Sequence, residues 1–352
     1  MFGHPGLDGV DISGQREPRF FSESGPKVRL TTGKDLASVT LENTPELIAH
    51  VSGQAAAKAA FKAGADAVYL NGDGLIGRPF DLTFDALEAL ADLADAHRKR
   101  LVVFMPAICD VRDMAEWSAQ IERLGDLDNV GVGVSNLGAL QLAKEFRIRE
   151  IVANVGLNVA NRVAADELST LGVSRVTASV EMNYEQLGHL LTHARLPVDV
   201  MVQGPMPGML LEHCVLATAS GTTPQGICPM PCRRGKYVME DVSGQSYPVL
   251  CDRRCRNHLY TATDVCVLPN LVRVLSDGVE HLRVEAPFDT PATVETVVAV
   301  YREAIDLVVK GRPLEADTLM DRVTSATGRP VSDGPFDFKA CIRRKERDIA
   351  HA

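Results

Sequence analysis

Residues 46–70 read ELIAHVSGQAAAKAAFKAGADAVYL. Short apolar runs at residues 47–51 and 67–70 are typical of buried strands. The Ala-rich stretch 54–63 between them predicts an amphipathic helix. A strand, a helix and a second strand in this order predict a βαβ unit, whose two strands are parallel neighbours in one sheet.

The same alternation continues along the chain. It predicts further strands at residues 101–105, 130–134, 151–155, 175–180, 198–202 and 281–284. It predicts further helices at residues 84–98, 112–123, 138–146, 161–171, 184–194 and 291–309. Eight strands that alternate with helices predict an α/β fold of the TIM-like (β/α)8 type, whose chemistry lies at the C-terminal ends of the strands.

The alternation fails between residues 204 and 270. Pro/Gly turns, short β-like pieces at 237–239 and 247–250, and most of the cysteines occupy this stretch. A long irregular segment in a compact fold is usually functional, and this one precedes the last strand, so we expect it over the C-terminal mouth of the barrel. The chain then divides into an N-terminal arm (1–45), a first barrel part (46–203), a cysteine-rich insertion (204–270), the last strand and helix (271–311) and a tail (312–352). The tail contains the basic residues 339–347, and we expect it to be a C-terminal helix.

Charge and hydropathy limit the class of protein. The 352 residues carry a formal net charge of −9, and a general nucleic-acid binder is usually basic instead. No run of 18 apolar residues predicts a membrane span, and no apolar signal segment opens the sequence, so we expect a cytoplasmic protein. Residues 225–256 differ locally, because six basic residues against three acidic ones give a net charge of +3. This segment is either a solvated loop or a positive collar around an anionic site.

Six cysteines lie within the insertion and its flank. They are Cys214, Cys228, Cys232, Cys251, Cys255 and Cys266. In a reducing compartment such clusters are more often metal ligands than disulfides. The two C-x3-C pairs suit either a zinc site or an iron–sulfur cluster. Unligated buried cysteines would explain one or two of the six, but not all.

The stretch 200–235, VMVQGPMPGMLLEHCVLATASGTTPQGICPMPCRRG, resembles the signature of the collagenase-like peptidase family U-32. Cys214 follows Gly204 by ten residues, and a Gly-x-Cys-x3-Cys-Arg element follows at residues 226–233. Residues 63–70, 155–187 and 262–306 resemble other parts of the family's barrel. The resemblance implies a TIM-like barrel with a 4Fe–4S cluster. It also implies oxygen-independent hydroxylation of RNA bases or of the aromatic ring of ubiquinone precursors, with prephenate as hydroxyl donor and, in some members, two related chains in a heterodimer.

The resemblance assigns cluster ligands one by one. Cys214, Cys228 and Cys232 fall on recurrent ligand positions, and Cys251 matches a Tyr-Pro-x-Leu-Cys context for the fourth. Cys255 and then Cys266 are the alternatives for that fourth ligand.

Two family positions concern acid–base chemistry. Glu181 matches a Glu at a strand end, and Glu285 matches the Glu of a Glu-Gly-Arg motif. Here Ala286 and Pro287 replace the Gly and the Arg, and residues 71–74 (NGDG) replace an Arg/Asn-rich turn, so the chain is a divergent member. Both glutamates are candidate catalytic acids or bases at the barrel mouth; the alternative is a salt bridge that closes the barrel.

Four further residues are candidate substrate ligands. Arg233, Arg253 and Arg254 are predicted to clamp a dicarboxylate such as prephenate, or else to pair with nearby Glu240, Asp241 and Asp252. Asn158 is predicted to hydrogen-bond the substrate, although Asn is also common in such turns.

The predicted function is 4Fe–4S-dependent, oxygen-independent hydroxylation of an aromatic or other small metabolite. A small molecule is favoured over RNA because the chain is acidic. The alternatives are hydroxylation of an RNA base, a non-catalytic cluster-binding subunit, and a peptidase that uses Cys214 with His213 or His258. A peptidase dyad would leave the other cysteines without a role, and no H-E-x-x-H zinc motif occurs. Expected partners are a related barrel protein in a heterodimer or a second copy of the chain.

Overall fold

Eight parallel strands close into a barrel in the computed structural model, which describes residues 44–76, 83–221, 228 and 230–336. The strands are β1 (Glu46–Val51), β2 (Ala67–Leu70), β3 (Arg100–Phe104), β4 (Val130–Val134), β5 (Ile151–Ala153), β6 (Arg175–Thr177), β7 (Val198–Gly204) and β13 (His281–Ala286). Each pairs with the next, and β13 pairs in parallel with both β1 and β7. The predicted TIM-like barrel and its eight strands are therefore confirmed.

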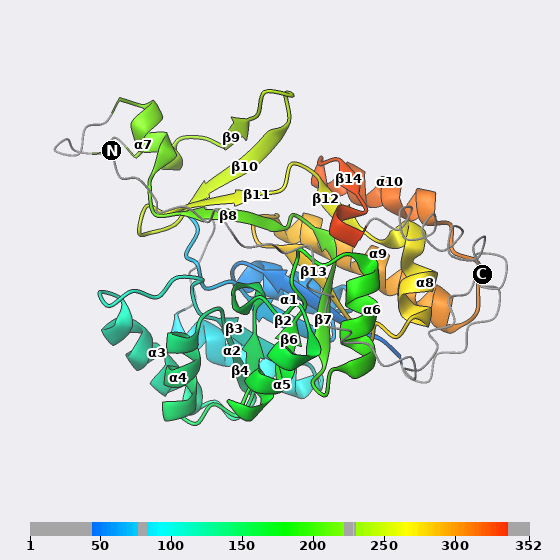
Figure 1. Cartoon of the computed structure of the whole chain (residues 1–352), viewed down its shortest axis with the longest axis horizontal. Coiled ribbons are helices and arrows are strands. Elements are labelled where there is room, and N and C mark those ends of the chain that lie inside the picture. The colour runs from blue at the N-terminus through cyan, green and yellow to red at the C-terminus, as the bar shows by residue number, and fades with distance from the viewer. Residues whose placement is uncertain (1–43, 77–82, 222–227, 229, 337–352) are drawn as a thin grey trace, which may run out of the picture.

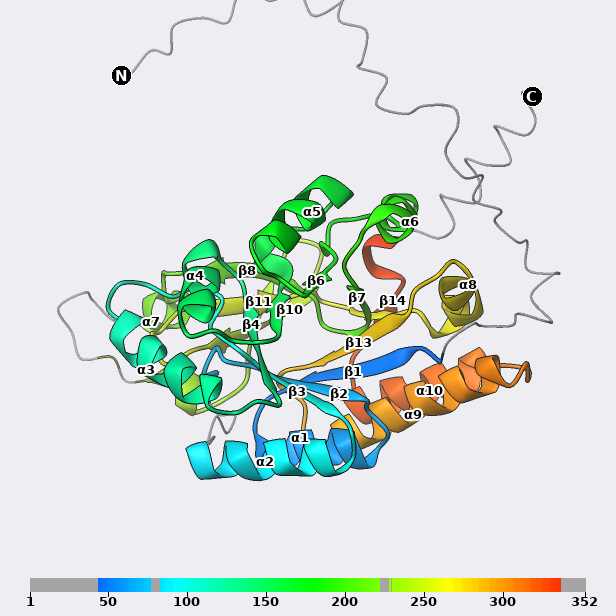
Figure 2. The same ribbon diagram turned by 90° about the horizontal axis from the view of Figure 1, so that it is seen from below.

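Seven helices surround these strands near the predicted positions. They are α1 (Gln54–Lys62), α2 (Phe84–Ala96), α3 (Met114–Gly125), α4 (Leu137–Glu145), α5 (Arg162–Thr170), α6 (Tyr184–His193) and α9 (Pro291–Val309). Figure 2 shows α1, α2 and α9 on one side of the strands and α4, α5 and α6 on the other. Asn136 and Asn183 accept hydrogen bonds from the first turns of α4 and α6, so these two asparagines cap helices.

Apolar side chains inside the barrel are few. They are Ile48, Ala67, Tyr69, Val102, Phe104 and Val152, and each is buried. Gly133 makes room for Phe104, because a Cβ atom there would lie 1.5 Å from the Phe104 ring. The larger apolar cluster lies between the strands and the helices.

Charged groups complete the interior. Tyr69 donates a hydrogen bond of 2.7 Å to Asp199, which also accepts one of 2.8 Å from Arg175. Glu46 lies 3.0 Å from Arg175 and 2.5 Å from Arg100. Burial alone would raise the pKa of Glu46, but the hydrogen bond with His281 and the two arginines together lower it to about 2.

The segment between β7 and β13 forms a second sheet. Its antiparallel order is β8 (Pro207–Leu211), β11 (Asn257–Tyr260), β10 (Ser246–Cys251) and β9 (Tyr237–Glu240), so both predicted β-like pieces are strands. We call these four strands the inserted sheet; Figure 1 shows it beyond one end of the barrel. Helix α7 (Val215–Ala219) follows β8, and β12 (Asp264–Cys266) returns to pair with β7.

Contacts identify the end of the barrel that the inserted sheet covers. The amide of Ile76, in the loop after β2, donates to the carbonyl of Cys251 at 2.7 Å, and Leu75 pairs with Asp252. Arg256 bonds Asp110 in the loop after β3 at 3.1 Å. Because these loops follow the C-terminal ends of their strands, the inserted sheet lies at the mouth where TIM-barrel chemistry occurs.

Three further elements lie outside the barrel and the inserted sheet's four strands. Helix α8 (Leu271–Ser276) precedes β13, while α10 (Ala316–Thr327) and β14 (Val331–Ser332) follow α9, with β14 parallel to β12. The basic stretch 339–347 and most of the N-terminal arm lie outside the described residues. No helix among the described residues is both long and apolar enough to cross a membrane.

Candidate metal centre and barrel mouth

Three of the predicted ligands meet at one corner of the inserted sheet. Cys251 ends β10 and is 3% exposed, Cys214 immediately precedes α7, and Cys232 lies in the 3-10 helix η3 (Pro231–Arg233). Burial raises the pKa of Cys251, and the neighbouring thiols of Cys214 and Cys232, within hydrogen-bonding reach, raise it further. Loops far apart in sequence therefore bring these three thiols together.

Cys255 and Cys228 belong to the same neighbourhood. Cys255 follows β10 with a positive φ of 62° and is exposed. Burial, and then the thiols of Cys214, Cys232 and Cys228, raise its pKa. We call Cys214, Cys228, Cys232, Cys251 and Cys255 the cysteine cluster.

Cys266 lies elsewhere. It is 4% exposed on β12, and the Tyr301 hydroxyl of α9 donates to its sulfur at 3.8 Å. Within the described part of the chain, no three His, Cys, Asp or Glu side chains are arranged to hold a single metal ion.

Asn257 contacts the cluster from β11 and is fully buried. Its Oδ1 accepts the backbone N–H of Val215 at 2.7 Å, which fixes the orientation of the amide. Its Nδ2 therefore faces sulfur, at 3.0 Å from Cys251 and 3.8 Å from Cys214. Sequence reasoning missed this residue, because only the pairing of β10 with β11 brings it to the thiols.

Glu285 lies inside the barrel mouth in a buried network. Its Oε2 is 2.6 Å from His50 Nδ1 on β1, and Arg283 forms an ion pair with its other oxygen. Burial alone would raise the pKa of Glu285, but Arg283 and then His50 lower it. His50 Nε2 is buried and has no hydrogen-bond partner among the described residues. Strand alternation, which turns Ile48 and His50 to the same face of β1, is the signal that would have indicated His50.

Glu181 and Asn158 lie on the exposed rim beyond β6 and β5. Asn158 adopts a left-handed conformation with a φ of 47°, and its Oδ1 accepts a hydrogen bond from Ser179 at 2.7 Å. Among the described residues, neither side chain hydrogen-bonds Glu285 or a thiol of the cysteine cluster.

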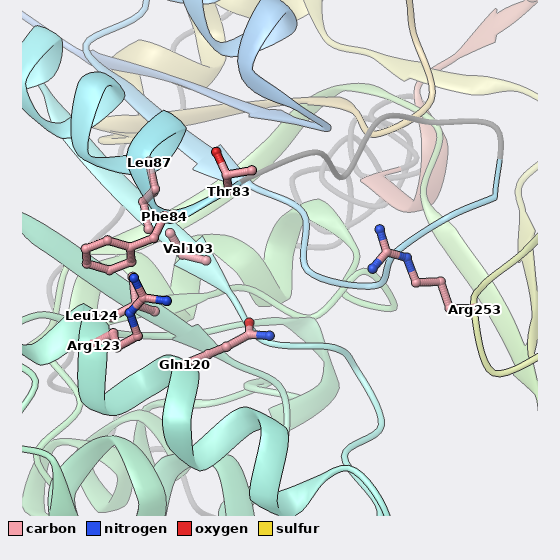
Figure 3. A pocket seen from close by; sticks show the side chains of 8 residues that line it. All are labelled: Thr83, Phe84, Leu87, Val103, Gln120, Arg123, Leu124 and Arg253. Atoms are coloured by element: carbon pink, nitrogen blue, oxygen red, sulfur yellow. The ribbon is translucent and has the colours of Figure 1, made fainter.

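The three predicted arginines are not brought together. Arg233 lines a cavity beside the cysteine cluster, whereas Arg254 pairs with Asp113 at the start of α3. Arg253 borders a different cavity of about 320 Å³, where its guanidinium points toward the helices that carry Phe84 and Arg123 (Figure 3). Arg254 reaches Asp113 because the turn that carries it folds onto the loops after β2 and β3.

The cavity beside the cysteine cluster has a volume of about 720 Å³. It lies between the inserted sheet and the residues around α9 and α10, and Cys232 and Cys251 form part of its wall. Arg233, Arg234 and Lys236 line it as well. A site of this size is in the range of small-molecule and nucleotide pockets, about 300–1,000 Å³.

The histidines of the rival dyad have other partners. The ring of His213 is hydrogen-bonded with the hydroxyl of Thr218 at 2.8 Å. His258 lies 3.3 Å from Asp252 and 3.9 Å from Asp73.

Curated relatives of the chain are distant in sequence. The 23S rRNA 5-hydroxycytidine C2501 synthase of Escherichia coli is 24% identical over 278 residues, which are 76% of this chain and 40% of that protein. The tRNA hydroxylation protein P1 of Bacillus subtilis is 21% identical over 267 residues, 74% of this chain and 63% of that protein. A Porphyromonas gingivalis protein named collagenase is 23% identical over 290 residues, 76% of this chain and 67% of that protein.

The chain thus spans less than two thirds of the first two relatives' own length. Peptidase family U32 matches residues 52–342, which include every strand of the barrel except β1 and the whole inserted sheet. The resemblance carried by the cysteine-containing motif is thereby confirmed, and the chain belongs to peptidase family U32.

Proposed function

We propose that this chain is an iron–sulfur enzyme that hydroxylates a base in RNA. The observation that carries the proposal is the cysteine cluster in the wall of a large cavity at the barrel mouth. Two relatives that match about three quarters of the chain are named for hydroxylation of rRNA or tRNA, which favours RNA over the small metabolite suggested by the acidic composition.

The donor set of the cysteine cluster fits a 4Fe–4S cluster. Soft thiolates select zinc or iron–sulfur clusters, and a cluster spreads its ligands more widely than a single ion does. The raised pKa values of Cys251 and Cys255 mean that these thiols stay neutral until a cation compensates their charge. We propose Cys214, Cys228, Cys232 and Cys251 as the ligands, with Cys255 as the alternative to Cys251. Cys266 is not a proposed ligand, because it lies apart from the other thiols and accepts a hydrogen bond from Tyr301.

A bound cluster would supply electron transfer or a Lewis-acidic iron beside the cavity. The chain's own residues would do the rest. The basic side chains of the cavity would bind the anionic substrate, and the inserted sheet would limit access of water to it. Glu285 holds the Nδ1 atom of His50, and its Nε2 atom has no hydrogen-bond partner among the described residues. Nε2 would therefore accept a proton at the barrel mouth.

Metal analysis tests the cofactor. Protein purified without oxygen is expected to contain near four irons and four sulfides per chain, with a broad visible absorption band. Cys232→Ala is expected to remove the iron and sulfide and the absorption band, because this thiol lies against that of Cys251. Cys266→Ala is the matched control and should leave the iron content unchanged. About one zinc without sulfide would contradict the proposal.

Nucleoside analysis tests the substrate. RNA from cells that express the wild-type chain is expected to contain a hydroxylated base that is absent when Cys232→Ala replaces it. The resemblance also implies an oxygen-independent reaction with prephenate as donor. Anaerobic assays with and without prephenate therefore separate that expectation from the choice of RNA as substrate.

A further inference from the structure

We infer that the cavity between the inserted sheet and α9 binds one unstacked nucleotide of single-stranded RNA, with the neighbouring phosphates on Arg233, Arg234 and Lys236. The inference deepens the proposed function and rests on it. It gives a binding role to Arg234 and Lys236, which follow the motif, together with Arg233 at its end.

The charges of the segment 225–256 separate in the folded chain. Arg254 pairs with Asp113, and Arg256 bonds Asp110 and Glu212, so these two guanidinium groups are compensated. Arg233, Arg234 and Lys236 are exposed and form no ion pair with any described carboxylate. Three of the six basic residues counted in the sequence therefore lie on the wall of one cavity, whereas Arg253 borders the other.

The acidic residue in that wall does not cancel this charge. Asp289 lines the cavity, but both of its oxygens bond Arg329, at 2.7 and 2.9 Å. The opposite wall includes Thr290 and Thr293 at the start of α9, a helix of 19 residues whose N-terminus adds a further positive potential. The cavity thus attracts an anion from two sides.

Aromatic side chains accompany the cations. Tyr237 lines the cavity, and its hydroxyl is fixed to the carbonyl of Pro231 at 3.0 Å, next to Cys232. Phe288 lines it as well, but this residue is 8% exposed, with Tyr260 edge-on at 5.0 Å and the Arg329 guanidinium over its ring at 5.0 Å. Tyr237 is therefore the more accessible of the two rings. Basic residues for the backbone and aromatic rings for the bases are the combination that binds single-stranded nucleic acid.

The position of the cysteines explains why one nucleotide enters. Cys232 and Cys251 are part of the wall, so a base must leave its stack to approach them. Enzymes that modify bases take the target out of the stack, and a single-stranded segment makes this easiest. A volume of about 720 Å³ has room for one nucleotide rather than for a duplex.

The test measures binding of a short fluorescent single-stranded RNA by anisotropy as a function of salt. Arg233→Ala/Arg234→Ala/Lys236→Ala is compared with Lys58→Ala/Lys144→Ala/Arg312→Ala, which removes the same charge from exposed sites on or beside outer helices. Each phosphate contact contributes about 0.7 to the salt slope of single strands, so the cavity variant should lose a slope of about 2. Between roughly 50 and 200 mM salt the wild type should therefore weaken about sixteenfold more than this variant.

Two further measurements complete the test. Tyr237→Ala, which leaves the charge unchanged, is expected to weaken binding about fivefold or more through lost stacking. A duplex of the same sequence is expected to bind more weakly than the single strand. Equal salt slopes for the two triple variants, or preference for the duplex, would overturn the inference.

Protein purified without oxygen is used throughout, and its iron content is measured beside RNA binding, so the site and the cofactor fail separately. The protein could bind RNA through the three cations and yet never load iron. That outcome would support this binding site and contradict the proposed hydroxylase. Iron loading with RNA binding indifferent to the cations would reject this site and keep the cofactor. Because the replaced side chains are exposed, unchanged thermal unfolding verifies that the variants fold.

Discussion

At the scale of single residues, Asn257 shows how one buried amide can prepare a thiol site. The backbone N–H of Val215 fixes Oδ1, so the Nδ2 group faces the sulfurs of Cys251 and Cys214. Hydrogen bonds to sulfur stabilise the thiolate form and tune a bound metal.

Asn257→Asp places an acceptor oxygen where the donor stood and is nearly isosteric. Carboxylate and thiolate would repel, so we expect iron to be lost to a chelator about tenfold faster or more, as is common for residues that support metal ligands. Asn129→Asp is the control, because exposed Asn129 also donates a side-chain hydrogen bond, of 3.0 Å to the carbonyl of Ala91, and it lies just before β4 rather than beside the cysteine cluster. Equal rates of iron release, followed by absorption, would reject the role of Asn257.

Glu46 connects a single residue to acid stability. Its pKa falls from 4.5 to about 2 in the folded chain, so the folded state binds the proton less tightly than the unfolded state does. Its contribution to stability is therefore present above pH 4.5 and is lost as pH falls toward about 2. A shift of this size corresponds to on the order of 3 kcal/mol.

Thermal unfolding between about pH 5 and pH 2.5 checks this. Glu46→Gln should be less stable than the wild type at pH 5, and the difference should shrink as the pH falls, because the wild-type carboxylate is being protonated. Glu122→Gln, at an exposed site, is the control and should keep a constant difference. A Glu46→Gln deficit that is independent of pH would contradict the linkage.

At the scale of elements, the attachment of the inserted sheet depends on the turn between β10 and β11. Arg256 is 2% exposed and bonds the carbonyl of Ile108 at 3.2 Å and the carboxylate of Asp110 at 3.1 Å. Asp252 accepts the amides of Arg254 and Arg256 at 2.8 and 2.9 Å, which shapes the turn. This turn carries Cys255 and follows Cys251, so its attachment also positions the thiols.

Arg256→Ala should destabilise the protein by about 3–5 kcal/mol, because the buried carboxylates of Asp113 and Asp252, 3.9 and 4.0 Å from its guanidinium, lose this cation. Arg112→Ala is a matched control, since Arg112 pairs with the same Asp110 but its side chain is 68% exposed. Exposed pairs contribute about 0–1 kcal/mol, so this variant should unfold near the wild-type midpoint. Denaturant unfolding measures both, and similar losses in the two variants would contradict the role given to burial.

At the scale of the whole molecule, the two sheets differ in what holds them. The barrel has its own apolar cluster, shared with the surrounding helices. The inserted sheet has little core of its own, since residues 238–240 of β9 and 207–209 of β8 are exposed. A metal in the cysteine cluster would join β10, α7 and η3, and would replace the missing core.

Removal of metal should therefore loosen one sheet only. Hydrogen exchange of chelator-treated, reduced protein is expected to accelerate in residues 207–260 and to stay unchanged in the barrel strands. Cys232→Ala should show the same pattern without chelator, whereas Cys266→Ala should not. Loss of protection throughout the chain would show that the metal stabilises the whole fold instead.

The barrel could be predicted from sequence because its cause is local. Apolar runs of strand length that alternate with amphipathic stretches appear in the order of the chain, and only the ends of elements differ: β6, for example, stops at Thr177 rather than at residue 180. The two strands predicted inside the insertion also have a local cause, whereas β8 and β11 have weaker local patterns and were not predicted.

The candidate cysteines could also be named from sequence, because reactive residue types and their spacing are visible in it. Which of them meet was decided by tertiary structure. The pairing of β10 with β11 brings Asn257 to Cys251, and β12 places Cys266 against Tyr301 of α9, outside the cysteine cluster. The arginines show the same dependence on tertiary structure. Arg233 lines the cavity, whereas Arg254 pairs with Asp113 at the start of α3. Sequence specifies which groups are available, whereas the distances on which ion pairs, thiol sites and cavities depend arise only when strands distant in the chain pack together.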